Sequence, residues 1–399
     1  MKKLISLSLL GCTSLFAGAE LDGIKAELEQ QKLMTQKLES KVNLLEEKKG
    51  TNNSASFSQK GYLPDMALLL NMSTVGRNVK NSEYENYAVP GFVKSGDAEL
   101  PFNKNRGFNL NYAELALHSV VDPYFEAFAY LHLHPNELEI DEGYVNTTAL
   151  PFGLRIKAGK FKSAFGRVNE KHQHAWSFDE QALIYKSLFG PDAISDAGLQ
   201  LQWVAPTDTY LMAGVEALQG TNDRSFGDSE KPNLGVAYLK SSVDVGDDLS
   251  ILGGLSVAHG KTEALKDSDV YGADLTLRDQ LGSYSSLVWQ SEYLNRKKDQ
   301  DNQAGFYSQL VYQYNNNYSA GVRYDKITKN DTDLSAYSAN TDNLDKYTAM
   351  LEYKPFPMSR LRLEYSHDRS KIIGDKRQNI DTLMLTLNIA AGAHGAHSY

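Results

Sequence analysis

Apolar and polar residues alternate in the C-terminal stretch of the chain, between positions 381 and 399. Odd positions such as Leu383 and Leu385 are apolar, whereas even positions such as Thr386 and Asn388 are polar. A period of two places successive side chains on opposite faces of a β-strand. The stretch therefore predicts a strand with one apolar face and one polar face.

Similar alternating segments, separated by turn residues, run from about residue 61 to the C-terminus. They predict sixteen strands, at 65–74, 108–119, 124–133, 137–146, 153–161, 197–205, 208–218, 233–243, 248–259, 268–279, 283–294, 303–315, 317–327, 344–355, 358–369 and 380–390. Single-chain bacterial barrels have an even number of antiparallel strands. The predicted fold class is all-β, a 16-stranded antiparallel transmembrane β-barrel at 61–399, preceded by a short α-helical coiled coil.

The predicted connections between these strands alternate in length. Short connections are expected at 120–123, 147–152, 206–207, 244–247, 280–282, 316 and 356–357. The intervening connections are mostly longer and polar, as at 75–107, 162–196, 219–232 and 328–343. Outer-membrane barrels have short turns at one end and longer loops at the other. We expect the long loop 162–196 to fold inward and narrow the barrel, or alternatively to cover its mouth.

Hydropathy and charge fit this fold better than a bundle of membrane helices. The mean hydropathy is negative, and the formal net charge is −9. A transmembrane barrel exposes only every second residue to lipid, so its average polarity resembles that of a soluble protein. Tyr occurs 23 times, against 15 Phe and 3 Trp, and this suits interfacial aromatic girdles. A secreted β-sandwich or solenoid is the soluble alternative, and no internal repeat of fixed period supports a solenoid.

The N-terminus predicts export. Lys2 and Lys3 precede a short apolar core, and Ala17-Gly18-Ala19 forms a small-residue cleavage site, so 1–19 reads as a signal peptide. Cys12 offers a lipoprotein site as the alternative. Cleavage after Ala19 would remove the single cysteine, which leaves no disulfide and no thiolate metal site in the mature chain. No cofactor is predicted.

Residues 20–49 differ from the rest of the chain. Apolar residues recur at a 3-4 spacing, at Leu21, Ile24, Leu28, Leu38, Val42 and Leu45, with polar Gln31 and Thr35 at two intervening core positions. This pattern predicts a periplasmic coiled coil of about four heptads, which needs partner helices, most simply from copies of the same chain. A solvated amphipathic helix is the alternative. Residues 50–60, rich in Asn and Ser in their first part, read as a linker.

Alternation also assigns charged residues to faces. Leu154 and Ile156 are expected to face lipid, so Arg155 and Lys157 face the lumen. A cation on the lipid face would cost about 2–4 kcal/mol at the bilayer midplane. The predicted lumenal cations, including those around the start of the long loop, are Arg155, Lys157, Lys160, Lys162, Arg167, Arg323, Arg360 and Arg362.

Acidic residues are predicted inside the strands before this loop. They are Glu114, Glu126, Glu139 and Asp141. With the cations they predict opposed basic and acidic walls, whose transverse field would orient solutes in the pore.

Histidines offer a second chemistry. His132 and His134 share one face of a predicted strand, and His172 and His174 lie in the long loop. Neutral imidazoles and carboxylates are suitable zinc ligands, which indicates a metal site. The alternative is that these histidines are solvated lumenal or loop residues, because a spacing of two on a strand only permits shared coordination.

Other function classes lack support. The chain contains no Gly-x-Ser-x-Gly, His-Glu-x-x-His or phosphate-binding glycine loop, so we expect no enzyme. The adjacent His118 and Ser119 would lie on opposite strand faces and could not form a nucleophile–base pair. The negative net charge and lumenal basic residues indicate no nucleic-acid binding.

Three short motifs carry a family resemblance: Asp122-Pro123-Tyr124-Phe125, Asp141-Glu142-Gly143-Tyr144-Val145, and Gly159-Lys160-Phe161-Lys162-Ser163-Ala164-Phe165-Gly166. With them the chain resembles the phosphate-selective porin O/P group and related uncharacterised proteobacterial porins. The resemblance implies a homotrimer of sixteen-stranded barrels with basic lumenal residues. Acids and histidines stand where phosphate selectivity would need a dense ladder of cations. The final Gly-Ala-His-Gly-Ala-His-Ser-Tyr is similar to tails of a histidine-bearing subset, some linked with zinc supply.

Together these features predict a porin of the Gram-negative outer membrane that passes small hydrophilic or ionic solutes by passive diffusion. The expected partners are outer-membrane lipid, copies of the chain in a homotrimer, and the solutes themselves. The first alternative is a substrate-specific channel or receptor for uptake of a divalent metal such as zinc. The second is an adhesin or envelope tether with a closed barrel.

Overall fold

The computed structural model describes residues 64–96, 105–133, 138–227, 230–339 and 341–392. The chain divides into two compact units, Met1–Tyr62 and Leu63–Tyr399. The expected signal peptide, coiled coil and linker all fall in the first unit, outside the described residues. The second unit is the β-structure that the alternation predicts.

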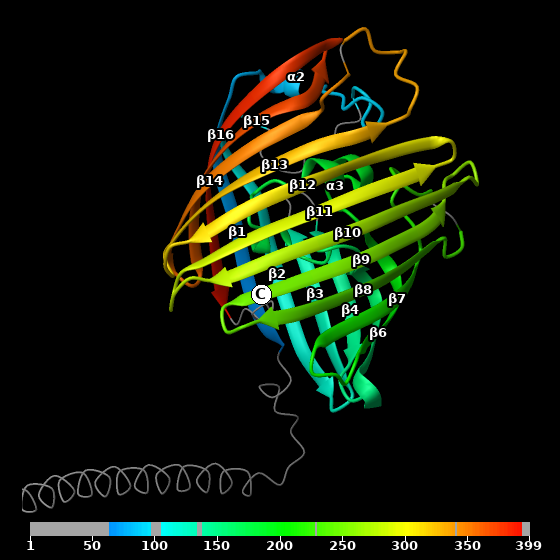
Figure 1. Cartoon of the computed structure of the whole chain (residues 1–399), viewed down its shortest axis with the longest axis vertical. Coiled ribbons are helices and arrows are strands. Elements are labelled where there is room, and N and C mark those ends of the chain that lie inside the picture. The colour runs from blue at the N-terminus through cyan, green and yellow to red at the C-terminus, as the bar shows by residue number, and fades with distance from the viewer. Residues whose placement is uncertain (1–63, 97–104, 134–137, 228–229, 340, 393–399) are drawn as a thin grey trace, which may run out of the picture. The chain divides into compact units, whose positions relative to one another are not determined.

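Sixteen antiparallel strands form a closed barrel in which each strand pairs with its neighbours in the sequence (Figure 1). The strands are β1 (Asp65–Arg77), β2 (Gly107–Asp122), β3 (Phe125–Leu133), β4 (Leu138–Thr147), β5 (Leu154–Lys162), β6 (Ser195–Val204), β7 (Tyr210–Leu218), β8 (Leu234–Val245), β9 (Leu249–Lys261), β10 (Asp267–Gln280), β11 (Ser286–Lys298), β12 (Asp301–Gln313), β13 (Tyr318–Asn330), β14 (Asp345–Phe356), β15 (Ser359–Ile373) and β16 (Lys376–Gly392). Pairing of β1 with β16 closes the sheet, with Leu69 opposite Ala390. The predicted antiparallel β-barrel and its strand number are confirmed, whereas the coiled coil before it stays a prediction.

Several strands extend beyond the predicted apolar alternation. β16 begins at Lys376 rather than at 380, and β15 continues to Ile373 rather than to 369. Here the ladder between the two strands continues through polar positions, with Lys371 opposite Gln378 and Ile372 opposite Arg377. Backbone hydrogen bonds between neighbouring strands do not require apolar side chains. The apolar alternation in the sequence therefore predicts only the part of each strand whose outward-facing side chains are apolar.

The two faces of the barrel differ in chemistry. Exposed apolar and aromatic side chains alternate along the outer face, as Leu361, Leu363 and Tyr365 do on β15. Arg362 and Glu364, between them, are buried on the inner face. This separation follows the period-two pattern of the sequence.

Within residues 64–392, the described helical elements are short and lie in the connections between strands. These are α2 (Asn81–Tyr84), η2 (Pro151–Gly153), η3 (Gln173–Ala175) and α3 (Leu183–Phe189). In the part of the chain that the structure describes, no helix is long and apolar enough to cross a membrane.

The connections differ in length between the two ends of the barrel, as predicted. Seven connections at one end contain two to six residues: 123–124, 148–153, 205–209, 246–248, 281–285, 314–317 and 357–358. At the other end, longer connections join β1 to β2, β5 to β6, β7 to β8 and β13 to β14. Those between β9 and β10, β11 and β12, and β15 and β16 are also short.

Candidate functional site

The connection between β5 and β6, residues 163–194 and hereafter the inner segment, lies inside the barrel. The Ala164 N–H donates to Glu216 of β7 at 2.9 Å, and the Leu183 N–H donates to Asp325 of β13 at 2.9 Å. These strands belong to different parts of a closed sheet, so a segment that contacts both must run through the interior. Figure 1 shows α3, part of this segment, within the barrel.

A turn at Gly166 directs the inner segment across the barrel. Gly166 has φ +64, a left-handed conformation that favours glycine. Its N–H donates to Ser256 of β9 at 2.9 Å. A Cβ at this position would lie 2.1 Å from Glu292 Oε1 and from the Tyr185 hydroxyl. The sequence therefore allows this close approach only because residue 166 has no side chain.

Apolar side chains of the inner segment pack into a cluster inside the barrel. Phe165, Ile184, Leu188 and Phe189 are buried in it, together with apolar inner-face residues such as Leu294. The connection between β1 and β2 also contributes buried residues to this cluster. The burial of α3 on nearly every side explains why a helix of seven residues is stable here.

A buried ion pair and hydrogen bonds from arginine side chains hold the inner segment to β13 and β15. Arg362 donates to Asp179 of the segment at 2.9 Å and to Glu352 of β14 at 2.6 Å. Arg323 donates to the carbonyl of Glu180 at 2.8 Å. Arg360 donates to the carbonyl of His174 at 2.9 Å.

Further pairs attach the segment to other parts of the wall. Arg167 Nε lies 2.7 Å from Asp274 Oδ1 on β10, and Lys240 Nζ on β8 lies 3.0 Å from Glu170. Tyr185 donates to Glu292 of β11 at 2.7 Å. Contacts of the inner segment thus reach strands on many sides of the barrel.

The prediction of opposed basic and acidic walls is wrong for these residues. Only β16 and β1 separate β15, which carries Arg360 and Arg362, from β2, which carries Glu114. Barrel closure, which the linear sequence does not display, brings these groups to the same side. Arg323 is likewise paired locally, with Asp325 at 2.9 Å.

The cations of β5 divide between the two faces. Arg155 donates to Gln202 at 2.8 Å on the inner face, and Lys157 lies 4.7 Å from the centre of the Tyr144 ring. Lys160 and Lys162 are an odd number of residues away from Arg155 and Lys157 along the strand, so their side chains start from the other face. They stand opposite Ala197 and Ser195 of β6.

Lys160 therefore has the outer-face register, and the expectation that it lines the lumen is wrong. Its Nζ donates to the carbonyl of Ile140 at 2.8 Å. Lys162 shares this register, but its Nζ turns to Asp141, 2.7 Å away.

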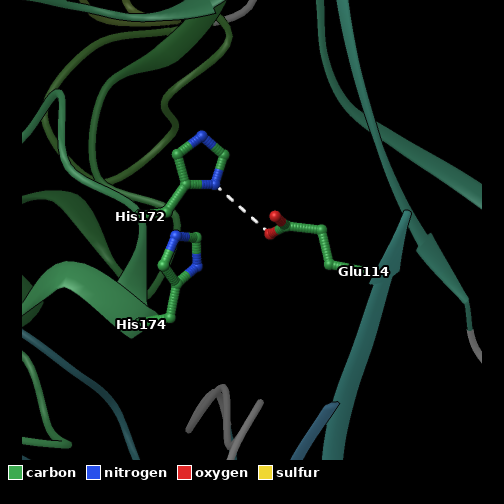
Figure 2. Close-up of side chains that lie close together, drawn as sticks. All are labelled: Glu114, His172 and His174. Atoms are coloured by element: carbon green, nitrogen blue, oxygen red, sulfur yellow. Dashed lines mark ion pairs between the residues drawn. The ribbon is translucent and has the colours of Figure 1, made fainter. Parts of the chain in front are cut away.

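Histidines and carboxylates gather where the inner segment meets β2, β3 and β4. Glu114 of β2 lies 3.3 Å from His132 of β3 and 3.3 Å from His172 of the inner segment. His172 also lies 2.5 Å from Glu142 of β4, and its ring centre is 5.5 Å from that of His174. Figure 2 shows Glu114 reaching from its strand toward the two loop histidines.

The other predicted members of this region lie at its margins. Glu139 stands opposite His132 in the register of β3 and β4. Glu126 is farther along β3, 3.5 Å from His118. His134 lies outside the described residues.

Contacts with neighbouring charged groups shift the pKa values of two side chains of the inner segment, His172 and Glu180. Burial opposes the charge of His172, but hydrogen bonds to Glu114 and Glu142 outweigh it and raise the pKa of His172 to about 9. Burial also opposes ionisation of Glu180, but Lys346 and Lys186 outweigh it and hold the pKa of Glu180 well below its usual range.

Sequence reasoning missed several acids that organise the interior, notably Glu142, Asp179, Glu180, Asp274 and Glu292. Alternation could have placed Asp274 and Glu292 inside, because both lie on inner-face positions of their strands. It could not have placed both Asp141 and Glu142 there. The register of β3 and β4 shifts between Tyr130 and Leu131, so that Glu142 and Ile140 are opposite these residues and Asp141 is the extra, bulged residue.

Comparison with known proteins identifies one relative and a set of structures of like fold. An uncharacterized protein of Aquifex aeolicus (strain VF5) is 37% identical over 394 residues, which cover 89% of this chain and 84% of the relative. The chain belongs to the same family as this protein. No family model matches the chain.

The solved structures with a similar barrel are outer-membrane porins and channels. They include the anion-selective porin from Comamonas acidovorans (TM-score 0.55, 10% identity, covering 83% of this chain and 100% of that chain). The outer membrane channel DcaP of Acinetobacter baumannii has a TM-score of 0.55 at 14% identity, covering 84% and 99%. OmpF of Salmonella typhi has a TM-score of 0.53 at 10% identity, also covering 84% and 99%. At this level of identity, the likeness is one of fold.

Proposed function

We propose that the protein is an outer-membrane porin that passes small hydrophilic or ionic solutes by passive diffusion through a channel narrowed by the inner segment. The likeness to outer-membrane porins and channels supports the general class. The attachment of the inner segment to many strands of the barrel is the observation that carries the proposal of a narrow channel.

The outer face supports a membrane location. Exposed large apolar residues recur on many strands, for example at Leu255, Leu351 and Leu363. Such a surface is stable in hydrocarbon, and closure of the sheet leaves no unpaired strand edge to desolvate. We therefore place the barrel in the outer membrane of a Gram-negative bacterium, with lipid as its partner.

Inside the barrel, solutes would pass between polar walls and the inner segment. Outside the cluster of Glu114, Asp141 and Glu142, the buried charges described above are mostly paired, so they would give little net field across the constriction. Partly exposed groups such as Arg155, Glu126 and Glu139 would then give modest selection between anions and cations. This arrangement supports a general channel for small ions more than one for phosphate.

We further propose that the protein is a homotrimer. The predicted coiled coil at 20–49 supplies the argument, because a single amphipathic helix cannot bury its own apolar seam. Porin-like barrels at the membrane would then be joined by their N-terminal helices.

Planar-bilayer recording tests the proposal. Purified, folded protein should give ohmic channels of small unitary conductance, with reversal potentials in a salt gradient near zero. A variant in which residues 172–189 are replaced by a glycine–serine linker should give larger channels, because the segment no longer occupies the lumen. Absence of ion current from both proteins, each shown to be folded and inserted, would overturn the proposed function.

A further inference from the structure

Side-chain donors from three neighbouring strands and the inner segment converge at one point of the inner wall. We propose that they form a binding site for a divalent transition metal of the zinc type. The ligands are Glu114 of β2, His132 of β3, Asp141 of β4 and His172 of the inner segment. This site stands on its own geometry and does not depend on the transport function.

The distances from each of the two carboxylates to each of the two histidines are near the edge lengths of a tetrahedral site. Glu114 Oε2 lies 3.3 Å from His132 Nε2 and 3.3 Å from His172 Nδ1. Asp141 Oδ2 lies 3.8 Å from the same His132 nitrogen and 3.6 Å from the same His172 nitrogen. Zinc bonds of about 2.0–2.2 Å to nitrogen and oxygen give tetrahedral edges of about 3.3–3.6 Å. Glu114, His132 and Asp141 have donor atoms that all lie within 4.8 Å of one another. A movement of the His172 ring toward them would complete the coordination sphere.

Two further observations indicate a ligand at this point. Glu142 contacts the other ring nitrogen of His172 at 2.5 Å, and metal-bound histidines are commonly oriented by such a carboxylate. The Glu114 carboxyl group is almost fully buried, and among the described residues its Oε1 atom has no hydrogen-bond partner. A buried carboxylate oxygen without a partner is costly, and a bound cation would remove that cost.

Fixed charges also favour a cation. Three carboxylates, those of Glu114, Asp141 and Glu142, lie in the cluster. Lys162 is the ammonium group that the described salt bridges place beside them, 2.7 Å from Asp141. A metal-bound His172 is neutral. In that form, three negative charges and one positive charge leave an excess of two, which a divalent ion would balance.

Donor chemistry narrows the class of metal. Mixed imidazole and carboxylate ligands suit Zn²⁺ and Co²⁺, whereas Ca²⁺ and Mg²⁺ prefer oxygen alone. The donor atoms of His174, Glu114 and His172 all lie within 4.8 Å of one another, so His174 lies beside the proposed site. A bound metal would tie the inner segment, through His172, to the wall formed by β2, β3 and β4.

Co²⁺ spectroscopy on the full-length, detergent-purified protein tests the site. Both C-terminal histidines are first replaced (His394→Ala and His397→Ala), so that they cannot bind the probe. We expect one equivalent of Co²⁺ to give the intense visible absorption of a tetrahedral complex, and Zn²⁺ but not Ca²⁺ to abolish it. In that background, His132→Ala and His172→Ala should remove the band, and Glu142→Gln should weaken binding about 10- to 100-fold.

His259→Ala provides a matched control, because His259 also contacts a carboxylate, Asp269 at 2.7 Å, but lies outside the cluster. It should leave the band unchanged.

Folding of each variant is checked by heat-modified gel mobility and circular dichroism. If folded protein gives no stoichiometric band, or if His259→Ala reduces it as much as His132→Ala, the proposal fails. The cluster would then be an ion-pair network closed by protonated His172. Channel recordings in metal-free buffer on the same samples separate this failure from failure of the porin proposal.

Discussion

Arg362 of β15 donates a hydrogen bond of 2.9 Å to Asp179 of the inner segment, which lies 183 residues earlier in the chain. Both side chains are almost fully buried. Arg362 also binds Glu352, so its removal would take the nearest cation from both carboxylates. Among the described ion pairs, Asp179 would keep only Arg360, at 4.0 Å, and Glu352 would keep Lys354, at 3.0 Å. The pair therefore links the position of the inner segment to the integrity of the barrel wall.

Arg362→Ala is expected to release the inner segment and enlarge the channel. Breaking a buried ion pair by removing one partner destabilises by about 3–5 kcal/mol, because a buried charge is left uncompensated. We expect a lower melting temperature and a larger, noisier unitary conductance in planar bilayers. The control is Lys329→Ala, which removes an exposed pair with Asp331 and should change neither quantity appreciably. Equal conductance in all three proteins would show that Arg362 does not position the segment.

Gly166→Ala is expected to displace the start of the inner segment. The new Cβ would overlap Glu292 and Tyr185, in addition to the strain of a positive φ. Gly246→Ala is the matched control, since Gly246 has φ +70 but a Cβ added there would meet no other atom within 4 Å. Both variants carry a similar backbone strain of about 1 kcal/mol. Only Gly166→Ala should raise the conductance, and a matching rise in the control would assign the effect to strain alone.

Acid is expected to loosen the inner segment through Glu180. Its pKa in the folded protein is lowered from 4.5, so the ionised carboxylate stabilises the fold above that value. This stabilisation is lost as the pH falls through the lowered pKa. The melting temperature of the wild type should therefore fall more steeply below about pH 5 than that of Glu180→Gln.

Glu85→Gln makes the same chemical change at an exposed position. It should retain the acid dependence of the wild type. If Glu180→Gln retains it as well, Glu180 is not the group responsible.

Leu363→Arg is expected to impair insertion of the barrel into lipid. Leu363 lies in the middle of β15 on the outer face, opposite Leu385 of β16. A lipid-facing arginine costs about 2–4 kcal/mol at the bilayer midplane and about 0–1 kcal/mol near the interface. Ser359→Arg, on the same face at the start of β15, is therefore the control. The folded fraction in vesicles should fall for Leu363→Arg only, and equal yields would contradict a lipid-facing outer surface.

Deletion of residues 20–49 should separate assembly from conduction. The predicted coiled coil supplies contacts between copies, so the shortened protein should show a smaller oligomeric mass by light scattering. Each barrel retains its own inner segment, and its unitary conductance should be unchanged. Loss of all current in the shortened protein would instead favour a tether in which the helix is essential to function.

The sequence by itself determined the barrel. Alternation between positions such as Leu363 and Glu364 is a local property, because neighbouring side chains of a strand point to opposite faces whatever the rest of the fold. The number of strands and the unequal connections follow from counting such segments. The apolar outer face and the inner position of Arg362 could be derived in the same way.

Only the tertiary structure decided which charged side chains inside the barrel contact one another. Closure between β1 and β16 brings Arg362 to the same side as Glu114, and the bulge at Asp141 turns two successive acids toward His172. The route of the inner segment then pairs Arg362 with Asp179. These contacts join residues far apart in the chain, so no local pattern encodes them. They depend on the register of the sheet and on the path of one connection through its centre.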